Sequence, residues 1–196
     1  MTSRVSPSSH NSSPSRWPVA TILVLALTAG CTTLQFLWPI VLEKLCRDPV
    51  ALKNGEWWRV ISPILVHDGG WTQIAFNFTV IAVVGTFVER IYGPRRWLIF
   101  YLLAGMTGEI AGYAWQPQGA GASVAGAGLL GALLLWLVAK RGLPWPARVG
   151  GTIGLLAAVA MSAIQDLHGP PILVGAALAS EFILRDAAPI ADQTVP

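Results

Sequence analysis

Charged residues are scarce in this chain of 196 residues, at 12% of the sequence against about 25% in an ordinary soluble domain. Hydrophobic residues make up 54%, and a soluble domain of this length has too little interior to bury them all. The net charge is only +3, and the basic residues stand at the ends of apolar segments instead of forming one patch. The composition therefore argues against a nucleic-acid-binding protein and predicts a protein surrounded by membrane lipid.

Cysteine is also rare, with two residues, Cys31 and Cys46. Neither belongs to a paired framework or to a spacing typical of metal ligands. No glycine-rich phosphate-binding loop stands between a predicted strand and a helix. We therefore expect no metal ion and no cofactor.

Apolar segments of roughly the ~20 residues that a spanning helix needs recur along the chain. We predict six spans, some barely long enough, at 17–40, 71–92, 97–115, 120–138, 146–164 and 167–184. Tryptophans stand at their ends, as in an interfacial aromatic belt: Trp17, Trp38, Trp71, Trp97, Trp115 and Trp145. The flanking segments 1–16 and 186–196 have the composition of disordered chain. We expect one all-α membrane domain over 17–185.

The basic residues predict the orientation of this domain. If the loops alternate between the two sides, nine basic residues fall on one side: Arg4, Arg16, Arg90, Arg95, Arg96, Lys140, Arg141, Arg148 and Arg185. The other side holds four, all in the long loop 43–68: Lys44, Arg47, Lys53 and Arg59. The positive-inside bias then places both termini in the cytoplasm of a multi-pass protein of the cell membrane. The long loop lies outside, where Trp57 and Trp58 favour a structure in the plane of the interface.

Four polar residues stand at the outer ends of the spans that run from outside to inside. Gln73 and Asn77 open the second span, Ser123 opens the fourth and His168 opens the sixth. A nucleophile, a base and two amide donors at one depth are the parts that acyl transfer requires. Each residue alone is better explained by packing or by helix–helix hydrogen bonds, so their coincidence carries the hypothesis.

Small residues at helical spacing strengthen this hypothesis. Gly126, Ala127 and Gly131 follow Ser123, and Gly175 and Ala179 follow His168. Such stripes let helix backbones approach closely in lipid. A close crossing of the fourth and sixth spans predicts contact between the Ser123 hydroxyl and the His168 imidazole, with the serine near a helix N-terminus.

Several stretches, in order, resemble the rhomboid family of intramembrane serine proteases. They are GEWWRVISPILVH at 55–67, WTQIAFNF at 71–78, GTFVERIYGPRRWLIFYLLAG at 85–105, GASVAGAGLLGA at 121–132, and His168 followed by Gly175. The Gly-x-Ser motif alone is a weak signal, whereas the ordered set over about 55–180 is specific.

The resemblance implies a bundle of six transmembrane helices with an outward-facing, water-filled cavity. It implies hydrolysis of peptide bonds in or near transmembrane segments of substrate proteins. Ser123 aligns with the nucleophile and His168 with the general base. Asn77 and the Ser123 backbone N–H align with the oxyanion donors, and Gly121 with the motif glycine. Gln73 stands where the family often has a histidine that assists the oxyanion.

Two further departures concern packing beside the pair. Val124 follows the serine where glycine is usual, and Pro170–Pro171 stands where two glycines are usual. A proline that faces the helix of Ser123 would hold the pair apart. The alternative function is therefore a catalytically weak or inactive rhomboid-like protein that binds transmembrane segments. A small transporter or channel is a third reading, with little support because no paired broken helices are visible.

The remaining polar residues receive structural interpretations. We expect Glu89 to bind loop or helix donors, Glu109 to reach toward the interface in preference to lining the cavity, and His67 to anchor its loop. Asp166 is interpreted as a solvated loop residue, with a triad as the alternative. Residues 27–31, ending at Cys31, resemble a lipoprotein cleavage box, but the apolar run continues beyond it, which favours a true first span.

Overall fold

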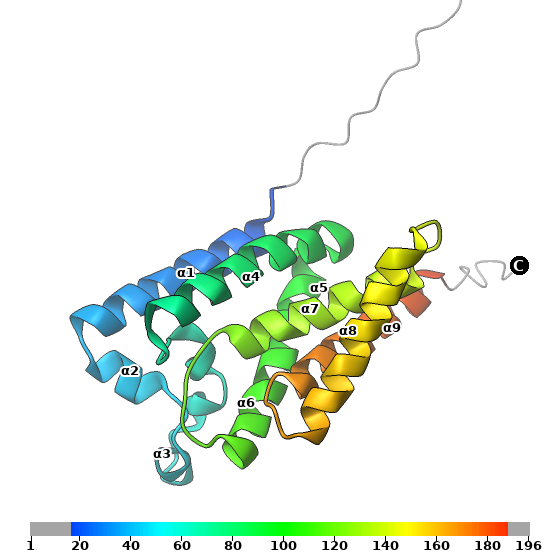
Figure 1. The fold of residues 1–196 in the computed structure, drawn as a ribbon. Coiled ribbons are helices and arrows are strands. Elements are labelled where there is room, and N and C mark those ends of the chain that lie inside the picture. Colours follow the sequence, from blue (N-terminus) through cyan, green and yellow to red (C-terminus); the bar gives the residue numbers. More distant parts are fainter. Residues whose placement is uncertain (1–16, 188–196) are drawn as a thin grey trace, which may run out of the picture.

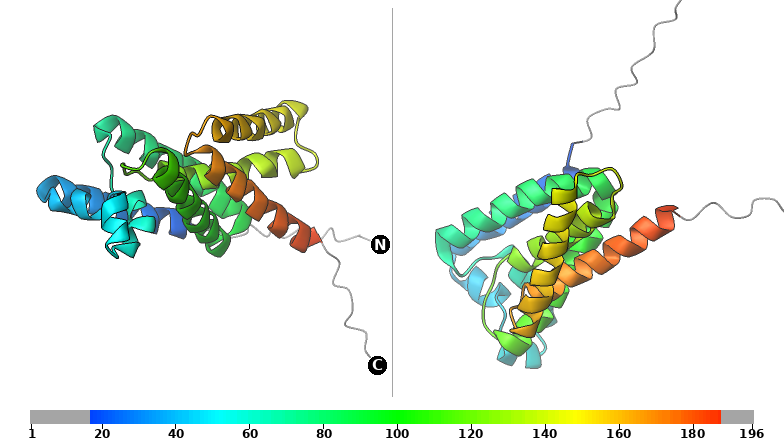
Figure 2. Two further views of the ribbon diagram at one scale, coloured as in Figure 1. Left: turned by 90° about the horizontal axis from the view of Figure 1, so that it is seen from below. Right: turned by 45° about the vertical axis from the view of Figure 1, so that its right-hand side comes forward.

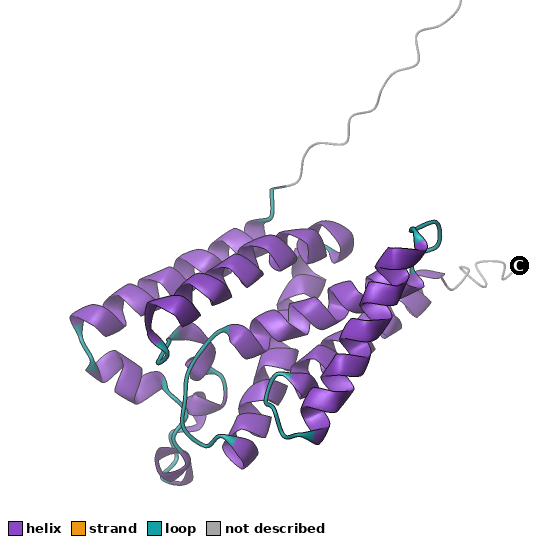
Figure 3. Ribbon diagram, in the orientation of Figure 1, coloured by secondary structure: helices purple, strands orange, loops and turns teal. Residues whose placement is uncertain are grey.

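The computed structural model describes residues 17–187, so the predicted disordered segment 1–16 and the tail from 188 onward lie outside the described residues. Within that range the regular structure is helical, as an all-α protein requires (Figure 3). The main helices are α1 (Val19–Leu37), α4 (Gly70–Tyr92), α5 (Pro94–Ile99), η3 (Phe100–Ala104, a π-helical turn), α6 (Gly105–Trp115), α7 (Ser123–Ala139), α8 (Trp145–Ala163) and α9 (Gly169–Ala187). The segment between α1 and α4 contains the short helices α2 (Ile40–Leu45) and α3 (Pro49–Lys53) and the 3-10 turns η1 (Trp57–Val60) and η2 (Ser62–Leu65).

Four helical stretches among the described residues are long and apolar enough to cross a membrane: α1, α4, the continuous run Pro94–Trp115, and α8. The other two predicted segments are also helices. However, α7 has only 17 residues, and the last turns of α9 carry charged side chains, Glu181, Arg185 and Asp186. The protein is thus a multi-pass membrane protein, and the count of six spans stays a prediction.

The sixth predicted segment is longer than expected at its C-terminal end. The tail was expected to begin at residue 186, but α9 continues to Ala187. The Asp186 carboxylate accepts two hydrogen bonds from Arg96, at 2.6 and 2.8 Å. The same guanidinium lies 4.7 Å from the ring centre of Phe182. These contacts fasten the last turn of α9 to the start of α5 and explain why the helix extends further.

Large apolar side chains point outward from the bundle along α1, α4 and α8: Leu23, Leu27, Phe76, Phe87, Ile153 and Leu156. Such a surface is unfavourable in water and normal in lipid. Of the tryptophans predicted to form an aromatic belt, Trp17, Trp38, Trp71 and Trp145 are exposed and Trp115 is half-buried, and their place at the interface stays a prediction. The prediction was wrong for Trp97, which is fully buried and whose indole N–H donates to the Gly85 carbonyl at 3.0 Å.

Helix α7 lies at the centre of the bundle, in contact with α4, α6, α8 and α9 (Figure 1). Its buried residues are all apolar and mostly small: Val124, Ala125, Gly126, Ala127, Gly128, Leu129, Gly131 and Ala132. A helix that is apolar on every side is stable where other helices surround it. Helix α8 stands at one edge of the bundle, where it packs on α7 and α9 (Figure 2).

Glycines let α7 and α9 cross with their backbones in contact. A Cβ on Gly131 would collide with the backbone carbonyl of Ile172, and one on Gly175 with the carbonyl of Gly128. The predicted stripes are confirmed at Gly131 and Gly175. The prediction was wrong for Gly126, which faces Val80 on α4, because the crossing uses the neighbouring face of α7.

This crossing predicts the effect of adding a methyl group. Gly131→Ala and Gly175→Ala should each lower the free energy of unfolding by about 1–3 kcal/mol, because the backbones must separate. Gly150→Ala is the matched control on α8, where no atom lies within 4 Å of the new Cβ, and it should stabilise by roughly 0.5–1 kcal/mol. Thermal unfolding in detergent micelles measures all three. Equal stability of the three variants would contradict the close crossing.

Glu89 fixes the start of α1, as predicted. Its carboxylate accepts hydrogen bonds from the backbone N–H groups of Ala20 and Thr21, each at 2.8 Å, and from the Thr21 hydroxyl. These donors are among those that a helix start leaves without intrahelical partners. Helix α1 then runs without a break through Cys31, as the interpretation of a true first span requires.

Candidate active site

Ser123 is the first residue of α7, so its side chain stands at a helix N-terminus, as predicted. The turn before it passes very close to the start of α4. A Cβ at Gly121 would lie 2.8 Å from the Gln73 amide nitrogen, which explains why glycine is needed there. The Gly121 N–H donates to the Pro63 carbonyl at 2.9 Å and ties the turn to the long loop.

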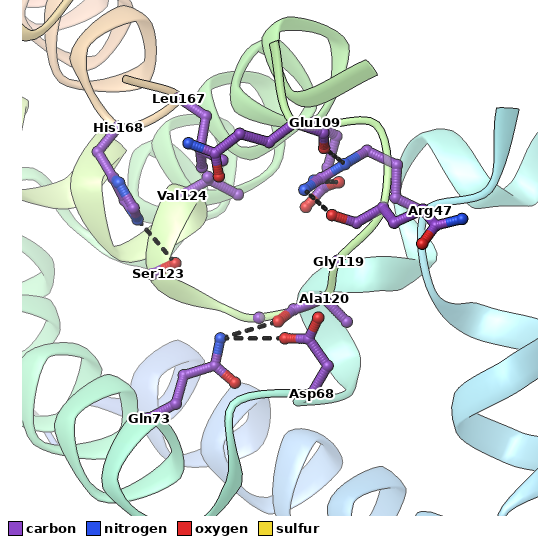
Figure 4. Close-up of a pocket in the computed structure, with 13 residues that line it drawn as sticks. Arg47, Asp68, Gln73, Glu109, Gly119, Ala120, Ser123, Val124, Leu167 and His168 are labelled. Atoms are coloured by element: carbon purple, nitrogen blue, oxygen red, sulfur yellow. Dashed lines mark hydrogen bonds and ion pairs between the residues drawn. The ribbon is translucent and has the colours of Figure 1, made fainter. Parts of the chain in front are cut away.

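His168 immediately precedes α9 and meets Ser123 across the α7–α9 crossing. Its Nε2 lies 3.0 Å from the Ser123 hydroxyl oxygen (Figure 4). Both side chains are partly buried. This separation falls within the range in which an imidazole accepts a hydroxyl proton. The sequence-predicted pair is therefore brought together by the glycine-lined helix contact.

Val124 and Pro171, the two residues that differ from the family pattern beside this pair, both pack against α6. A Cβ at Gly108 would lie 2.5 Å from the Val124 side chain and 3.2 Å from Pro171, so both side chains occupy the space above this glycine. Pro171 therefore faces α6 instead of standing between Ser123 and His168. The expected obstacle to the pair is not present in this arrangement.

Gln73 and Asn77 lie on α4 beside the turn that carries Gly121. The Gln73 amide donates to the Ala120 carbonyl at 2.9 Å and to Asp68 at 3.4 Å, so both of its N–H bonds are used. Asn77 is 1% exposed, and neither its amide nitrogen nor its oxygen has a hydrogen-bond partner. A buried amide without partners is costly unless a ligand or water satisfies it.

Asp166 lies closer to the pair than the sequence interpretation assumed. Its Oδ1 accepts from the His168 backbone N–H at 2.9 Å and lies 2.8 Å from Nδ1 of the ring. Partial burial acts to raise the pKa of Asp166, but the hydrogen bonds from His168 outweigh it, and the pKa lies below its ordinary value. The reading as a merely solvated loop residue was wrong, because the turn before α9 folds the carboxylate back onto the ring.

Glu109 was expected to reach toward the interface, and this was wrong. It is 1% exposed, and its carboxylate binds the Arg47 guanidinium at 2.5 Å. Arg47 also donates to the carbonyls of Gln116 and Gln118. The sequence held no signal for this pair, because 62 residues separate its members and the long loop determines their approach.

A pocket opens beside Ser123 and His168, and most of the side chains that line it are polar. They include Arg47, Asp68, Gln73, Glu109, Gln116 and Gln118 (Figure 4). The Arg47–Glu109 pair joins the long loop to α6 at one wall of this pocket. Water can be held there by charges and amides, although the surrounding helices are apolar.

His67 takes no part in the pocket. Its backbone N–H and carbonyl bind the Gln35 amide, at 2.9 and 2.6 Å, and its ring contacts Thr32 on α1. The predicted loop-anchoring role is confirmed. Across residues 17–187, no three His, Cys, Asp or Glu side chains are grouped as a metal site would require.

Comparison with known proteins agrees with this arrangement. The family model of the rhomboid domain matches residues 54–179. YdcA of Bacillus subtilis (strain 168) is 38% identical over 159 residues, which cover 76% of this chain and 78% of YdcA. Rhomboid protease GluP of the same organism is 47% identical over 91 residues, which cover 46% of this chain and 18% of GluP. Rhomboid protease AarA of Providencia stuartii is 33% identical over 63 residues, or 32% of this chain and 22% of AarA. With most of its length matched by that domain, the chain belongs to the rhomboid family.

Proposed function

We propose that this protein is an intramembrane serine endopeptidase that cleaves peptide bonds in or near transmembrane segments of other membrane proteins. The observation that carries this proposal is the 3.0 Å contact between the Ser123 hydroxyl and His168 Nε2 beside a polar pocket. The family supports an intramembrane protease as the general class. No cofactor enters the mechanism.

The chemistry follows from the contact. His168 Nε2 takes the proton of the Ser123 hydroxyl while Oγ attacks the carbonyl carbon of the scissile peptide bond. The imidazolium then gives this proton to the leaving amine, and an acyl ester on Ser123 remains. A water molecule, activated by the same imidazole, hydrolyses the ester and restores the serine hydroxyl.

The oxyanion that forms in the first step requires hydrogen-bond donors. The buried Asn77 amide, which has no partner in the protein, is the side-chain donor that we propose, together with the Ser123 backbone N–H at the start of α7. Gln73 would have to release Ala120 or Asp68 before it could donate, so we assign it a supporting role. The absence of a side chain at Gly121 keeps this space open.

The membrane arrangement that we propose has six spans, with α7 and α9 as the fourth and sixth. The first residues of α1 and the last residues of α9 lie toward the same end of the bundle (Figure 1). Of the four basic residues at the other end, Arg47 and Arg59 are buried in ion pairs, which leaves fewer free charges there. We therefore place both termini in the cytoplasm of a cell-membrane protein, and the pocket toward the outside.

The test is cleavage in liposomes that contain the purified protein and a test substrate with a single transmembrane segment. Wild-type protein should release a fragment cut in or beside that segment. A serine-directed fluorophosphonate should attach to Ser123, as located by mass spectrometry, and protein labelled in this way should no longer cleave.

The inactive alternative predicts a different pair of results. A transmembrane peptide would bind to the protein, but Ser123 would take up no fluorophosphonate and no fragment would appear. That outcome, with the protein shown to be folded, would end the proposal of proteolysis.

A further inference from the structure

We propose that Asp166 is a positioning residue for His168, so that Ser123, His168 and Asp166 act together as a triad. This inference rests on the proposed function and deepens it. The pair alone places an imidazole beside a hydroxyl. It does not determine which ring nitrogen carries the proton.

The contact of Asp166 determines that tautomer. A carboxylate oxygen only accepts hydrogen bonds, so the ring nitrogen 2.8 Å from Asp166 Oδ1 must carry a hydrogen and donate it. His168 Nδ1 is then protonated, and Nε2 offers its lone pair to the Ser123 hydroxyl. The carboxylate also lies where it can stabilise the imidazolium that forms when the proton of Ser123 is taken up.

The chain builds this contact through an unusual turn between α8 and α9. Gln165 has φ of 61°, and it is the one described residue other than glycine with a positive φ. The Asp166 N–H donates to the Met161 carbonyl and the Gln165 N–H to the Ser162 carbonyl, which is the pattern of a Schellman C-cap. Side chains are disfavoured in this conformation, so the tertiary structure must hold the turn in place.

The residue after His168 also packs closely against α8. A Cβ at Gly169 would collide with Ser162, so the start of α9 rests directly on the end of α8. Asp166 thus stands between two helix ends that touch. Asp166 lies two residues before His168, and this spacing lets one of its carboxylate oxygens bind both the backbone N–H and the ring of the histidine.

The simpler interpretation gives Asp166 only a role in the turn, because its Oδ1 accepts the His168 backbone N–H. The surrounding charges argue that Asp166 also acts on the His168 ring. Arg47 and Glu109 bind each other, and Asp68 binds Gln73, so these groups of the pocket are engaged elsewhere. Among the described residues, Asp166 is the carboxylate in contact with the His168 ring.

Replacing Asp166 with asparagine separates the two roles. The amide oxygen can still accept the backbone N–H and keep the turn, but the negative charge is lost. We expect kcat to fall by ~10- to 100-fold with KM little changed, less than the ~10⁴-fold typical of a buried triad aspartate, because water reaches Asp166.

Asp186→Asn is the matched control, since Asp186 binds Arg96 near the other end of α9 and should leave both quantities unchanged. A role in the turn alone would leave kcat of Asp166→Asn at its wild-type value, and this result would overturn the inference. If Ser123→Ala and His168→Ala cleaved like wild type, the proposed function itself would fail.

A measurement on the wild-type protein needs no variant and therefore remains decisive if Asp166→Asn does not fold. With ¹⁵N-labelled histidine, the neutral ring of His168 should be the Nδ1–H tautomer. Detection of the Nε2–H tautomer would overturn the inference, because Nε2 would then be unable to accept the proton of Ser123.

Discussion

Ser123→Ala and His168→Ala are each expected to lower the rate of substrate cleavage by about 10⁴- to 10⁶-fold, because nucleophile and base act as one unit. Their contact at 3.0 Å is the reason for this expectation. For the same reason, the double variant should be no slower than either single variant. The rates are measured with the single-span substrate in liposomes, at enzyme concentrations high enough to follow slow cleavage.

Ser180→Ala serves as the control for this experiment. Its hydroxyl donates to the Ala177 carbonyl of its own helix, away from the pocket, so full activity is expected. All variants should unfold within a few degrees of wild type, since the changed side chains are partly exposed and small. Cleavage by Ser123→Ala at more than a tenth of the wild-type rate would assign the hydrolysis to another residue or to a contaminant.

Arg47→Ala is expected to cause the largest loss of stability, about 3–5 kcal/mol, because it leaves a buried carboxylate without its partner. The two side chains are only 4% and 1% exposed. Arg47 also lies against Gly112, where a Cβ would be 2.6 Å from the guanidinium carbon, so its removal leaves empty space on α6. Unfolding by heat and by SDS in mixed micelles provides the measurement.

The comparison is with Arg185→Ala, which removes an arginine from an exposed pair with Glu181 on α9. Exposed pairs contribute about 0–1 kcal/mol, so this variant should resemble wild type. Replacing both members of the buried pair, with Arg47→Met and Glu109→Met together, should recover much of the lost stability. Equal losses for Arg47→Ala and Arg185→Ala would mean that the buried pair is not important for folding.

The positions of Ser123 and His168 were predictable because two simple signals agreed. Alternating loops placed both residues at the same end of the bundle, and small residues at helical spacing indicated that their helices touch. Gly131 and Gly175 carry this contact as expected. The register between α7 and α9 was harder to predict. Gly126 and Gly128 are only two positions apart, and the sequence alone does not say which of them faces α9.

The contacts made by the loops could not be predicted from sequence patterns. The Arg47–Glu109 pair depends on how a long irregular segment folds back onto α6, and no periodicity describes such a path. The contact of Asp166 with His168 depends on a single residue, Gln165, in a conformation that propensities disfavour. Trp97 was misplaced because an aromatic side chain at a helix end suits both an interface and a packed core.

The order of the helices also determines when the proposed active site can be complete. Ser123 and His168 are 45 positions apart, and the whole of α8 is made between them. A growing chain that has inserted only as far as α8 holds Ser123 without His168, and the face of α7 around Gly131 still lacks its partner helix. Under the proposed function, newly made protein would be unable to cleave its neighbours in the membrane until synthesis has passed residue 168 and α9 has docked.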